Sequence, residues 1–320
     1  MNVSIVIPTL NEGPDLEATV ALCLASKWRP TEIIVIDDCS KRPVSERLAS
    51  FDGVTVIRND RRLGSSVSKH RGVAASTGDL VVVCDAHVRP AWDWLDRLVA
   101  AHKMHPTSIL APISKGFDSD CQFVGLGCLF TWSEGYYKAT WAPFEIEDGP
   151  YVVPCVMGGV YAMPRALLED VGGFAPGLRG WGYEEEYLCL RAWMRGWECR
   201  TVPNVEVPHQ YTRSIDREDA NGERPDPWEF FYNVHVAMAV VFGEEEFLGT
   251  HRPWLASLAP SQDLDLQLTL DAQRIRTISD RVRAGRVLSN TALREKVAMP
   301  MRDPPPKAMA PPPVITEVPA

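Results

Sequence analysis

Residues 80–90 read Leu-Val-Val-Val-Cys-Asp-Ala-His-Val-Arg-Pro, and this stretch decides the fold. Five apolar residues run without interruption into Asp85. A continuous, largely β-branched run of this length indicates a strand that is buried on both faces of a parallel sheet. Ligands of open α/β sheets bind at the carboxyl ends of the strands. The stretch therefore predicts a parallel sheet with a functional site where this strand ends.

Asp85 and His87 are the candidate site residues of this strand end. In an extended chain, residues two apart point to the same side, so the two side chains can bind one ion. A carboxylate and an imidazole, with room left for phosphate oxygens, suit Mn²⁺ or Mg²⁺ better than a closed zinc cage. An aspartate that caps the next helix beside a surface histidine would give the same triplet, and the triplet alone does not decide between the two.

Composition narrows the classes of protein. The 320 residues suffice for one large α/β domain or two small ones, and the net charge of −9 without a basic block disfavours a nucleic-acid partner. The 8 cysteines form no Cys-x-x-Cys pair, which predicts free thiols in a reducing, cytoplasmic compartment. We find neither a signal-peptide pattern nor an apolar run of about 20 residues, so we expect no integral membrane segment.

Strand and helix patterns alternate along the first third of the chain. Strands are predicted at 3–8, 32–38, 54–58, 80–85 and 108–113, and helices begin near Pro14, Gly64 and Asp93. This alternation predicts an α/β fold with a doubly wound, mostly parallel sheet flanked by helices. The periodicity stops in the aromatic segment 114–154, which we interpret as a core layer over the sheet in preference to an acceptor groove.

The C-terminal part has a different pattern. A helix is predicted from Asp226 to Gly243, and a second helix within 264–283 belongs to a C-terminal helical extension. The proline-rich stretch 300–320 predicts a disordered tail. The expected domains are therefore 1–250, with halves 1–113 and 114–250, then the helical extension 251–299 and the tail.

Four motifs in the first half carry a resemblance to a known family. They are Ser-Ile-Val-Ile-Pro-Thr-Leu-Asn-Glu at 4–12, Ile-Val-Ile-Asp-Asp-Cys-Ser at 34–40, the helix start at 64–72, and Asp85-Ala86-His87. By these motifs the chain resembles the nucleotide-sugar-binding half of a family 2 glycosyltransferase with the GT-A fold. The resemblance implies that Pro8, Thr9 and Glu12 line the uridine pocket, that Asp38 meets the base or ribose, and that Lys69 contacts the diphosphate. Taken singly, the turn residues among these are also explained by turn and cap chemistry.

The second half contains a further set of motifs, and their order along the chain is informative. They are Gly158-Gly159, Gly172-Gly173-Phe174, Trp181-Gly182-Tyr183-Glu184 and Arg191-x-Trp193. The first pair lies within a predicted strand at 156–164, where glycine indicates that main chain passes close to another group. This order is similar to that of the polypeptide N-acetylgalactosaminyltransferases, whose metal motif is also Asp-x-His. Family 2 enzymes carry their catalytic base in an acidic pair at this helix start, so the resemblance to family 2 implies Glu185 as first and Glu184 as second choice for base and an inverting transfer. The N-acetylgalactosaminyltransferase-like motifs imply retention instead, and they imply His209 as the third metal ligand after Asp85 and His87. Trp181 is a further candidate for contact with the nucleotide sugar, and so is Arg213, which lies in the polar segment 211–225 just after His209. An ordinary surface loop is the alternative interpretation of that segment. Acids in a first helical turn also complement the helix dipole, which is the structural alternative.

Together these patterns predict a metal-dependent glycosyltransferase. We expect it to move a sugar from a nucleotide sugar, expected to be a UDP-sugar, to an acceptor hydroxyl of a glycan or small molecule, with Mn²⁺ or Mg²⁺ as cofactor. The alternatives are transfer to a peptide or protein side chain and a non-catalytic nucleotide-sugar-binding protein. The expected partners are the nucleotide sugar and the acceptor, with a homodimer as an open alternative.

Overall fold

One large mixed sheet organises the protein. The computed structural model describes residues 1–117, 123–133, 135–142, 144–211, 221–222, 226, 228–258 and 261–298. In the described residues the sheet runs in the order β3-β2-β1-β4-β10-β5-β11-β9, with β6 paired to β5. Its strands are β1 (Val3–Thr9), β2 (Glu32–Asp37), β3 (Val54–Arg58), β4 (Leu80–Cys84), β5 (Ser108–Gly116), β6 (Val124–Gly125), β9 (Tyr151–Val152), β10 (Val160–Pro164) and β11 (Glu198–His209). Strands β3, β2, β1 and β4 are parallel, β10 is antiparallel to β4 and β5, and β11 is parallel to β5.

Strand β4 lies at the centre of this sheet and is buried on both faces. Val81 and Val83 belong to the apolar core on one face, whereas Leu80, Val82 and Cys84 belong to the core on the other. Each of these side chains is fully buried. This alternation explains why the sequence of β4 is apolar throughout and confirms the prediction of a doubly covered strand.

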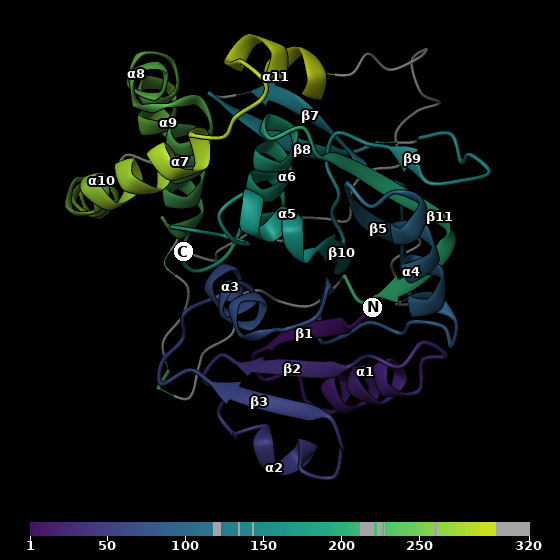
Figure 1. The fold of residues 1–320 in the computed structure, drawn as a ribbon. Coiled ribbons are helices and arrows are strands. Elements are labelled where there is room, and N and C mark those ends of the chain that lie inside the picture. The colour runs from purple at the N-terminus through teal and green to yellow at the C-terminus, as the bar shows by residue number, and fades with distance from the viewer. Residues whose placement is uncertain are drawn as a thin grey trace.

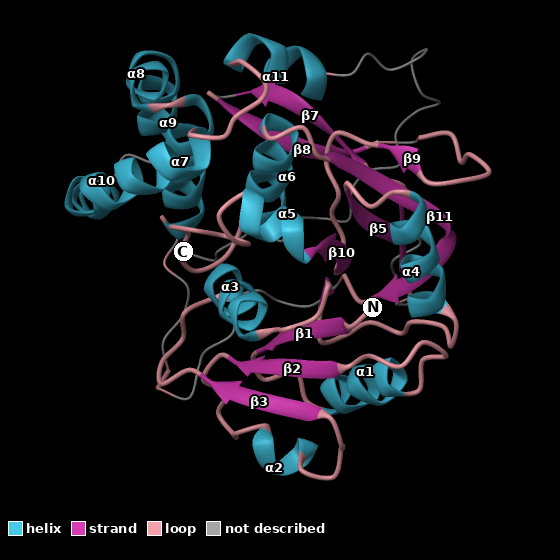
Figure 2. Ribbon diagram, in the orientation of Figure 1, coloured by secondary structure: helices cyan, strands magenta, loops and turns pink. Residues whose placement is uncertain are grey.

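Helices cover both faces of the sheet (Figures 1 and 2). The apolar side chains of α1 (Pro14–Leu24), α2 (Ser45–Leu48) and α4 (Trp94–Met104) join the core of one face. Those of α3 (Ser65–Ala75), α5 (Arg165–Asp170), α6 (Glu184–Met194) and α7 (Glu229–Phe242) join the core of the other. The doubly wound, mostly parallel architecture expected from the sequence is therefore present.

The C-terminal helices form an extension at the upper part of the view in Figure 1. They are α8 (Glu244–Glu246), η1 (Phe247–His251), α9 (Arg252–Leu258), α10 (Gln262–Arg283) and α11 (Asn290–Val297). Leu264, Ile275 and Leu293 belong to the same apolar core as α6 and α7. The extension is therefore packed onto the sheet domain through a shared core. The proline-rich tail lies outside the described residues.

Two local expectations change in the structure. The glycine pair 158–159 precedes β10, whereas the sequence suggested that it lies within a strand. The aromatic segment contains β7 (Cys128–Ser133) and β8 (Tyr136–Trp141), which pair as a separate antiparallel ribbon. Five of its aromatic side chains are buried, namely Phe123, Phe130, Tyr136, Tyr137 and Tyr151, which supports the interpretation as a core layer. Phe117 and Trp132 are exceptions, each with 40% of its surface exposed.

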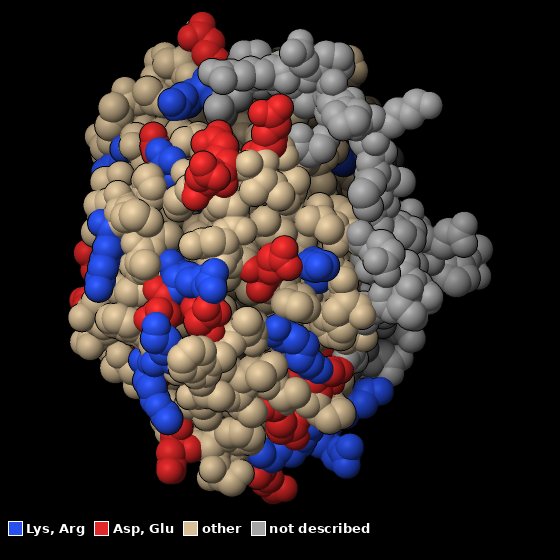
Figure 3. All heavy atoms as spheres, turned by 90° about the vertical axis from the view of Figure 1, so that its right-hand side faces the viewer, with Lys and Arg blue, Asp and Glu red and all other residues tan. Residues whose placement is uncertain are grey.

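The surface carries mixed charge. In Figure 3, which shows the right-hand side of the view in Figure 1, basic and acidic side chains are interspersed and no broad basic patch forms on that face. Within the described part of the chain, no helix combines the length and the apolar character that a bilayer crossing needs.

We predict that Gly72→Ala destabilises the protein. Helix α3 contacts the sheet so closely at Gly72 that a Cβ there would lie 2.3 Å from Val6 Cγ1. Overpacking of this kind costs about 1–3 kcal/mol, although alanine is normally the better helix former. Urea unfolding monitored by circular dichroism measures the change in the free energy of unfolding.

Gly249→Ala is the matched control for this substitution. Gly249 lies in η1 and has no heavy atom within 4 Å of an added Cβ. The control should leave the free energy of unfolding unchanged or raise it slightly. Equal stability of the two variants would contradict the close packing of α3 on the sheet.

Candidate active site

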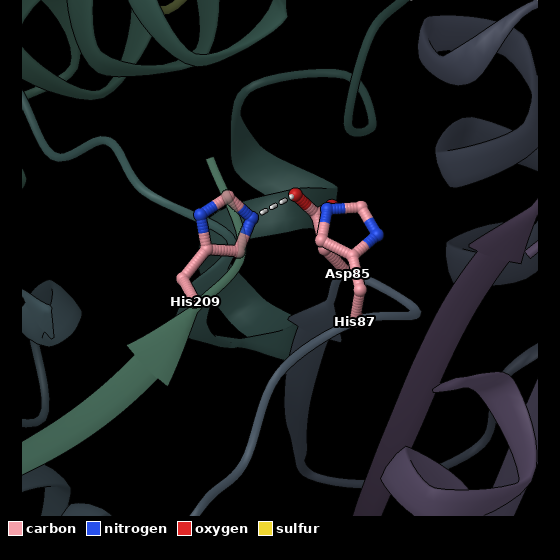
Figure 4. Close-up of side chains that lie close together, drawn as sticks. All are labelled: Asp85, His87 and His209. Carbon is pink, nitrogen blue, oxygen red and sulfur yellow. Dashed lines mark hydrogen bonds and ion pairs between the residues drawn. The ribbon is translucent and has the colours of Figure 1, made fainter. Parts of the chain in front are cut away.

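Three side chains from two distant parts of the chain converge at the carboxyl end of β4 (Figure 4). Asp85, His87 and His209 each offer one ligand atom, and these atoms all lie within 4.8 Å of one another. His209 Nε2 lies 3.2 Å from Asp85 Oδ2, and the two imidazole rings are 4.9 Å apart. One carboxylate and two imidazoles form an open donor set, which suits a divalent ion such as Mn²⁺ that takes its remaining ligands from substrate and water.

Backbone pairing brings His209 to this position. His209 lies at the end of β11 and forms an antiparallel bridge with Val88, just after the triplet Asp85-Ala86-His87. The amide of Arg89 donates to Pro208 O at 2.9 Å, and the amide of Gln210 donates to His87 O at 3.2 Å. The separation between the ligands is therefore set by hydrogen bonds of the main chain and not by side-chain rotamers alone.

The absence of side chains at Gly158 and Gly159 leaves room for the His209 ring and for Ser114. A Cβ on Gly159 would lie 2.5 Å from His209 Cδ2, and one on Gly158 would lie 2.8 Å from Ser114 Cβ. Gly159 O also accepts the amide of Asp85 at 2.6 Å. Glycine is thus required where main chain passes directly beside the cluster, as the sequence predicted for this pair.

Charges around the cluster favour an ionised carboxylate. Burial acts to raise the pKa of Asp85, but the ammonium of Lys69 and the imidazoles of His209 and His87 outweigh it and hold that pKa well below its usual range. Burial lowers the pKa of His209, with Asp85 acting in the opposite direction. The cluster therefore presents a charged carboxylate and a largely neutral imidazole near neutral pH, which are the protonation states that bind a metal.

Glu184 is held by four donors at the start of α6. Its carboxylate accepts from the hydroxyls of Ser65 and Ser66 at 3.1 and 3.0 Å, from the amide of Gly182 at 2.8 Å and from Lys69 Nζ at 3.1 Å. The residue is 1% exposed. These contacts join the start of α3 to the start of α6 and occupy both carboxylate oxygens of Glu184.

Glu185 is held less tightly and is more accessible. Its Oε1 accepts from Lys69 Nζ at 2.8 Å and from the Tyr161 hydroxyl at 3.0 Å. Burial and, to a smaller extent, Glu184 raise the pKa of Glu185 to about 7, while Lys69 acts to lower it. Burial and the neighbouring Glu185 raise the pKa of Glu186 to about 8. Of the three acids, Glu185 has the environment expected of a general base near neutral pH.

The residues expected to bind the nucleotide occupy the same end of the sheet. Thr9 is buried at the end of β1, directly beside Asp37 of β2, and Pro8 precedes it. The carboxylate of Asp38 accepts from the amides of Leu63 and Gly64 at 2.8 Å and from Asn59 Nδ2 at 2.6 Å, so in this structure it caps the loop before α3.

The other expected nucleotide contacts are placed differently. Glu12 Oε2 lies 3.3 Å from His87 Nδ1, and Lys69 Nζ is paired with the two carboxylates of α6. The ring of Trp181 is 40% exposed and faces Phe230 of α7. Arg213 lies outside the described residues. Contacts of these side chains with a nucleotide stay predictions.

Sequence reasoning missed several residues that shape the site. Tyr161 bonds to Glu185 from β10, and the hydroxyls of Ser65 and Ser66 bond to Glu184 from α3. A Cβ on Gly64 would lie 2.2 Å from the main chain of Gly180, so these two glycines set the distance between the halves of the site. Gly64 is visible in the sequence as a helix start, whereas the three hydroxyls carry no local signal.

The family models match the chain in two overlapping regions. Residues 4–170 match the model of glycosyl transferase family 2, and residues 146–214 match the model described as the N-terminal domain of galactosyltransferase. The first match covers more than half of the chain. The chain therefore belongs to glycosyl transferase family 2, as the motifs of its first half predicted.

Curated relatives and solved structures agree with this family. The chain is 28% identical over 232 residues to polypeptide N-acetylgalactosaminyltransferase 10 of Mus musculus. This alignment covers 67% of this chain and 38% of the mouse protein. It is 31% identical over 203 residues to N-acetylgalactosaminyltransferase 7 of Drosophila melanogaster, and this alignment covers 56% of this chain and 34% of the Drosophila protein. The chain thus spans less than two fifths of the length of these relatives.

The fold is shared with two solved glycosyltransferase structures. A crystal structure of GalNAc-T7 with UDP, GalNAc and Mn²⁺ matches with a TM-score of 0.71 at 24% identity, over 93% of this chain and 57% of that chain. S. aureus TarS 1-349 in complex with UDP-GlcNAc matches with a TM-score of 0.55 at 14% identity, over 88% of this chain and 82% of that chain. The likeness to GalNAc-T7 confirms the expected GT-A fold.

We predict that Gly159→Ala weakens divalent-ion binding while the protein stays folded. The added Cβ would displace the His209 ring from Asp85. Isothermal titration with Mn²⁺ should show a loss of at least about tenfold in affinity, the lower end of what disturbed metal sites lose.

Gly53→Ala is the control for backbone strain. Gly53 has a φ of +80°, similar in sign to the +62° of Gly159, but an added Cβ there meets no atom within 4 Å. The control should lose stability and keep the affinity for Mn²⁺. Unchanged Mn²⁺ affinity in Gly159→Ala would contradict the ligand role of His209.

Proposed function

We propose that this protein is a metal-dependent glycosyltransferase that moves a sugar from a UDP-sugar to an acceptor hydroxyl. The observation that carries the proposal is the convergence of Asp85, His87 and His209 within 4.8 Å at the strand ends, beside the carboxylate of Glu185. Relatives named as N-acetylgalactosaminyltransferases and a fold neighbour solved with UDP and Mn²⁺ support it.

In this proposal the metal site stabilises the leaving group. The bond between the anomeric carbon and the diphosphate oxygen breaks, and its electron pair leaves with UDP. A divalent ion, when bound by Asp85, His87 and His209, supplies a Lewis acid that neutralises the charge growing on the diphosphate. The charged carboxylate of Asp85 and the neutral imidazole of His209 are in the protonation states that this ion needs.

Glu185 is the base that we assign to the acceptor. It removes the proton of the acceptor hydroxyl while the hydroxyl oxygen bonds to the anomeric carbon, which corresponds to an inverting transfer. Its pKa of about 7 makes it a good proton acceptor near neutral pH. Glu184 takes the structural part, because its oxygens already accept from two serine hydroxyls, a main-chain amide and Lys69.

The acceptor can be a glycan, a small molecule or a peptide. A glycan or small molecule is the first candidate. The hydroxyl of a peptide side chain is the second candidate, and the names of the polypeptide N-acetylgalactosaminyltransferases support it. Parallel transfer assays with a glycan array and a serine- and threonine-containing peptide library, each with the donor that the protein hydrolyses, separate the acceptor classes.

The cellular location and the oligomeric state of the protein are two further predictions. The cysteines of the described chain, Cys23, Cys39, Cys84, Cys128, Cys155, Cys189 and Cys199, are free and buried, which is compatible with the expected cytoplasmic location. Fractionation of cells that express the protein measures that location. Sedimentation equilibrium measures whether it forms a homodimer.

We predict slow, Mn²⁺-dependent release of UDP from one UDP-sugar in a panel without acceptor. EDTA and the substitution His87→Ala should both abolish the release, because either change removes the charge compensation of the leaving group. His105→Ala replaces a histidine of the loop after α4 and should retain full activity. If no UDP-sugar is hydrolysed and calorimetry detects no Mn²⁺-dependent UDP binding, the glycosyltransferase proposal fails.

We predict that Glu185→Gln lowers kcat about 10²–10⁴-fold, with UDP affinity unchanged, because the variant loses only the base. Glu186→Gln is the control from the same helical turn, and it should stay near full activity because the raised pKa of Glu186 already makes that carboxyl mostly neutral at pH 7. Nuclear magnetic resonance of the product identifies the anomer. A retained anomeric configuration, or full activity of Glu185→Gln, would contradict the assignment of the base.

The pH dependence tests the coupling between Lys69 and Glu185. A base must be unprotonated, so kcat/KM should fall about tenfold per pH unit below about pH 7. Lys69 lowers the pKa of Glu185, so Lys69→Met should raise that pKa and shift the acidic limb to higher pH, whereas Lys69→Arg should keep it in place. An acidic limb that does not move in Lys69→Met would show that another group sets it.

A further inference from the structure

Glu12 lies directly behind one of the candidate metal ligands. Its Oε2 is 3.3 Å from His87 Nδ1, and both side chains are largely buried, at 8% and 14% exposure. Figure 4 shows the other ring nitrogen of His87 turned toward Asp85 and His209. The order carboxylate, imidazole, metal cluster is the arrangement in which an outer carboxylate orients a metal-binding histidine.

The turn before α1 is built to aim Glu12 inward. Asn11 and Gly13 on either side of it both have positive φ angles, of 55° and 65°. The amide of Asn11 donates to Ser40 Oγ at 3.0 Å, and Asn11 Oδ1 accepts the amide of Lys41 at 2.8 Å. This turn is therefore fixed to the loop after β2, and its shape is costly to a residue other than glycine or asparagine.

Helix α1 also holds the segment that carries His87. Thr19 Oγ1 lies 3.0 Å from both Ala86 O and Val88 O and accepts the amide of Val88 at 3.2 Å. Asp15 forms an ion pair with Arg89 one residue further on. The residues on both sides of His87 are thus bonded to the helix that follows Glu12, so the two side chains are held against each other by the fold.

We propose that Glu12 is a positioning residue for the metal site. Its carboxylate oxygen, 3.3 Å from Nδ1, favours a proton on that nitrogen, which selects the tautomer with an unprotonated Nε2 and keeps that nitrogen toward Asp85 and His209. A neutral histidine can carry its proton on either nitrogen, and only the nitrogen without the proton can bind a metal. This inference rests on the proposed function, and it gives Glu12 a role distinct from the expected contact with uridine.

The first test measures metal affinity apart from catalysis. Titration of the protein with Mn²⁺ in the absence of nucleotide, monitored by the electron paramagnetic resonance signal of free Mn²⁺, gives the dissociation constant. We expect Glu12→Ala to weaken binding about 10–100-fold, as losses of outer carboxylates do, and Glu12→Gln to weaken it less because the amide oxygen still accepts from Nδ1–H. Glu17→Gln removes a carboxylate of α1 that pairs with Arg47, and it should bind Mn²⁺ as the wild type does.

The second test observes the tautomer directly. Long-range ¹H–¹⁵N spectra of the metal-free protein with ¹⁵N-labelled histidine distinguish a protonated from an unprotonated ring nitrogen, and His87→Ala identifies the signals of His87. The wild type should show His87 with Nδ1 protonated and Nε2 unprotonated. Glu12→Ala should shift these signals toward the other tautomer, a change that a general loss of stability would not produce.

The outcomes separate this inference from the proposed function. Absence of Mn²⁺ binding in the wild type contradicts the proposed function, whereas wild-type binding with the same affinity and the same His87 tautomer in Glu12→Ala contradicts only the role of Glu12. A third outcome is a loss of UDP affinity measured in EDTA with unchanged Mn²⁺ affinity. That result would assign Glu12 to the uridine pocket and overturn the inference.

Discussion

The contact between Asp85 and His209 is the interaction on which the rest of the site depends. The two residues are separated by 124 positions in the chain and lie 3.2 Å apart. Main-chain bonds between residues 88–89 and 208–209 and the bare backbone at Gly159 hold them together. Because β11 runs parallel to β5, it returns the chain to the carboxyl end of the sheet, where β4 also ends. The order of the strands therefore brings together the three candidate metal ligands.

A second centre of charge lies beside this contact. Lys69 is buried between Glu184 and Glu185 and also influences Asp85, so one cation balances the carboxylates of both halves of the site. Breaking a buried ion pair by removing one partner is costly, typically about 3–5 kcal/mol. The pairing thus links the stability of the junction between α3 and α6 to the pKa of Glu185. It also explains why three consecutive acids are tolerated where α6 begins.

Much of this fold could be predicted from the sequence, and the reasons are local. Strand β4 is apolar throughout because both of its faces are covered. Asp85 and His87 lie together as expected, but β4 ends at Cys84 and the chain makes a turn at residues 86–87, so their convergence does not come from the extended chain that the sequence suggested. His209 could not be found from such rules, since its partner is distant and only the family resemblance pointed to it. The contrast between Glu184 and Glu185 also escaped local reasoning. It depends on hydroxyls of Ser65 and Ser66 in α3 and on Tyr161 in β10, which no spacing reveals.

Electron spin-echo spectroscopy of the protein with Mn²⁺ and UDP detects the nuclei that surround the bound ion. We predict couplings to two histidine nitrogens, one from His87 and one from His209, together with a phosphorus coupling from the diphosphate. Selective loss of one nitrogen coupling in His209→Ala would identify the second ligand. A Mn²⁺ ion that binds with no histidine nitrogen, or that shows no phosphorus coupling when UDP is present, would contradict a catalytic metal site at the end of β4.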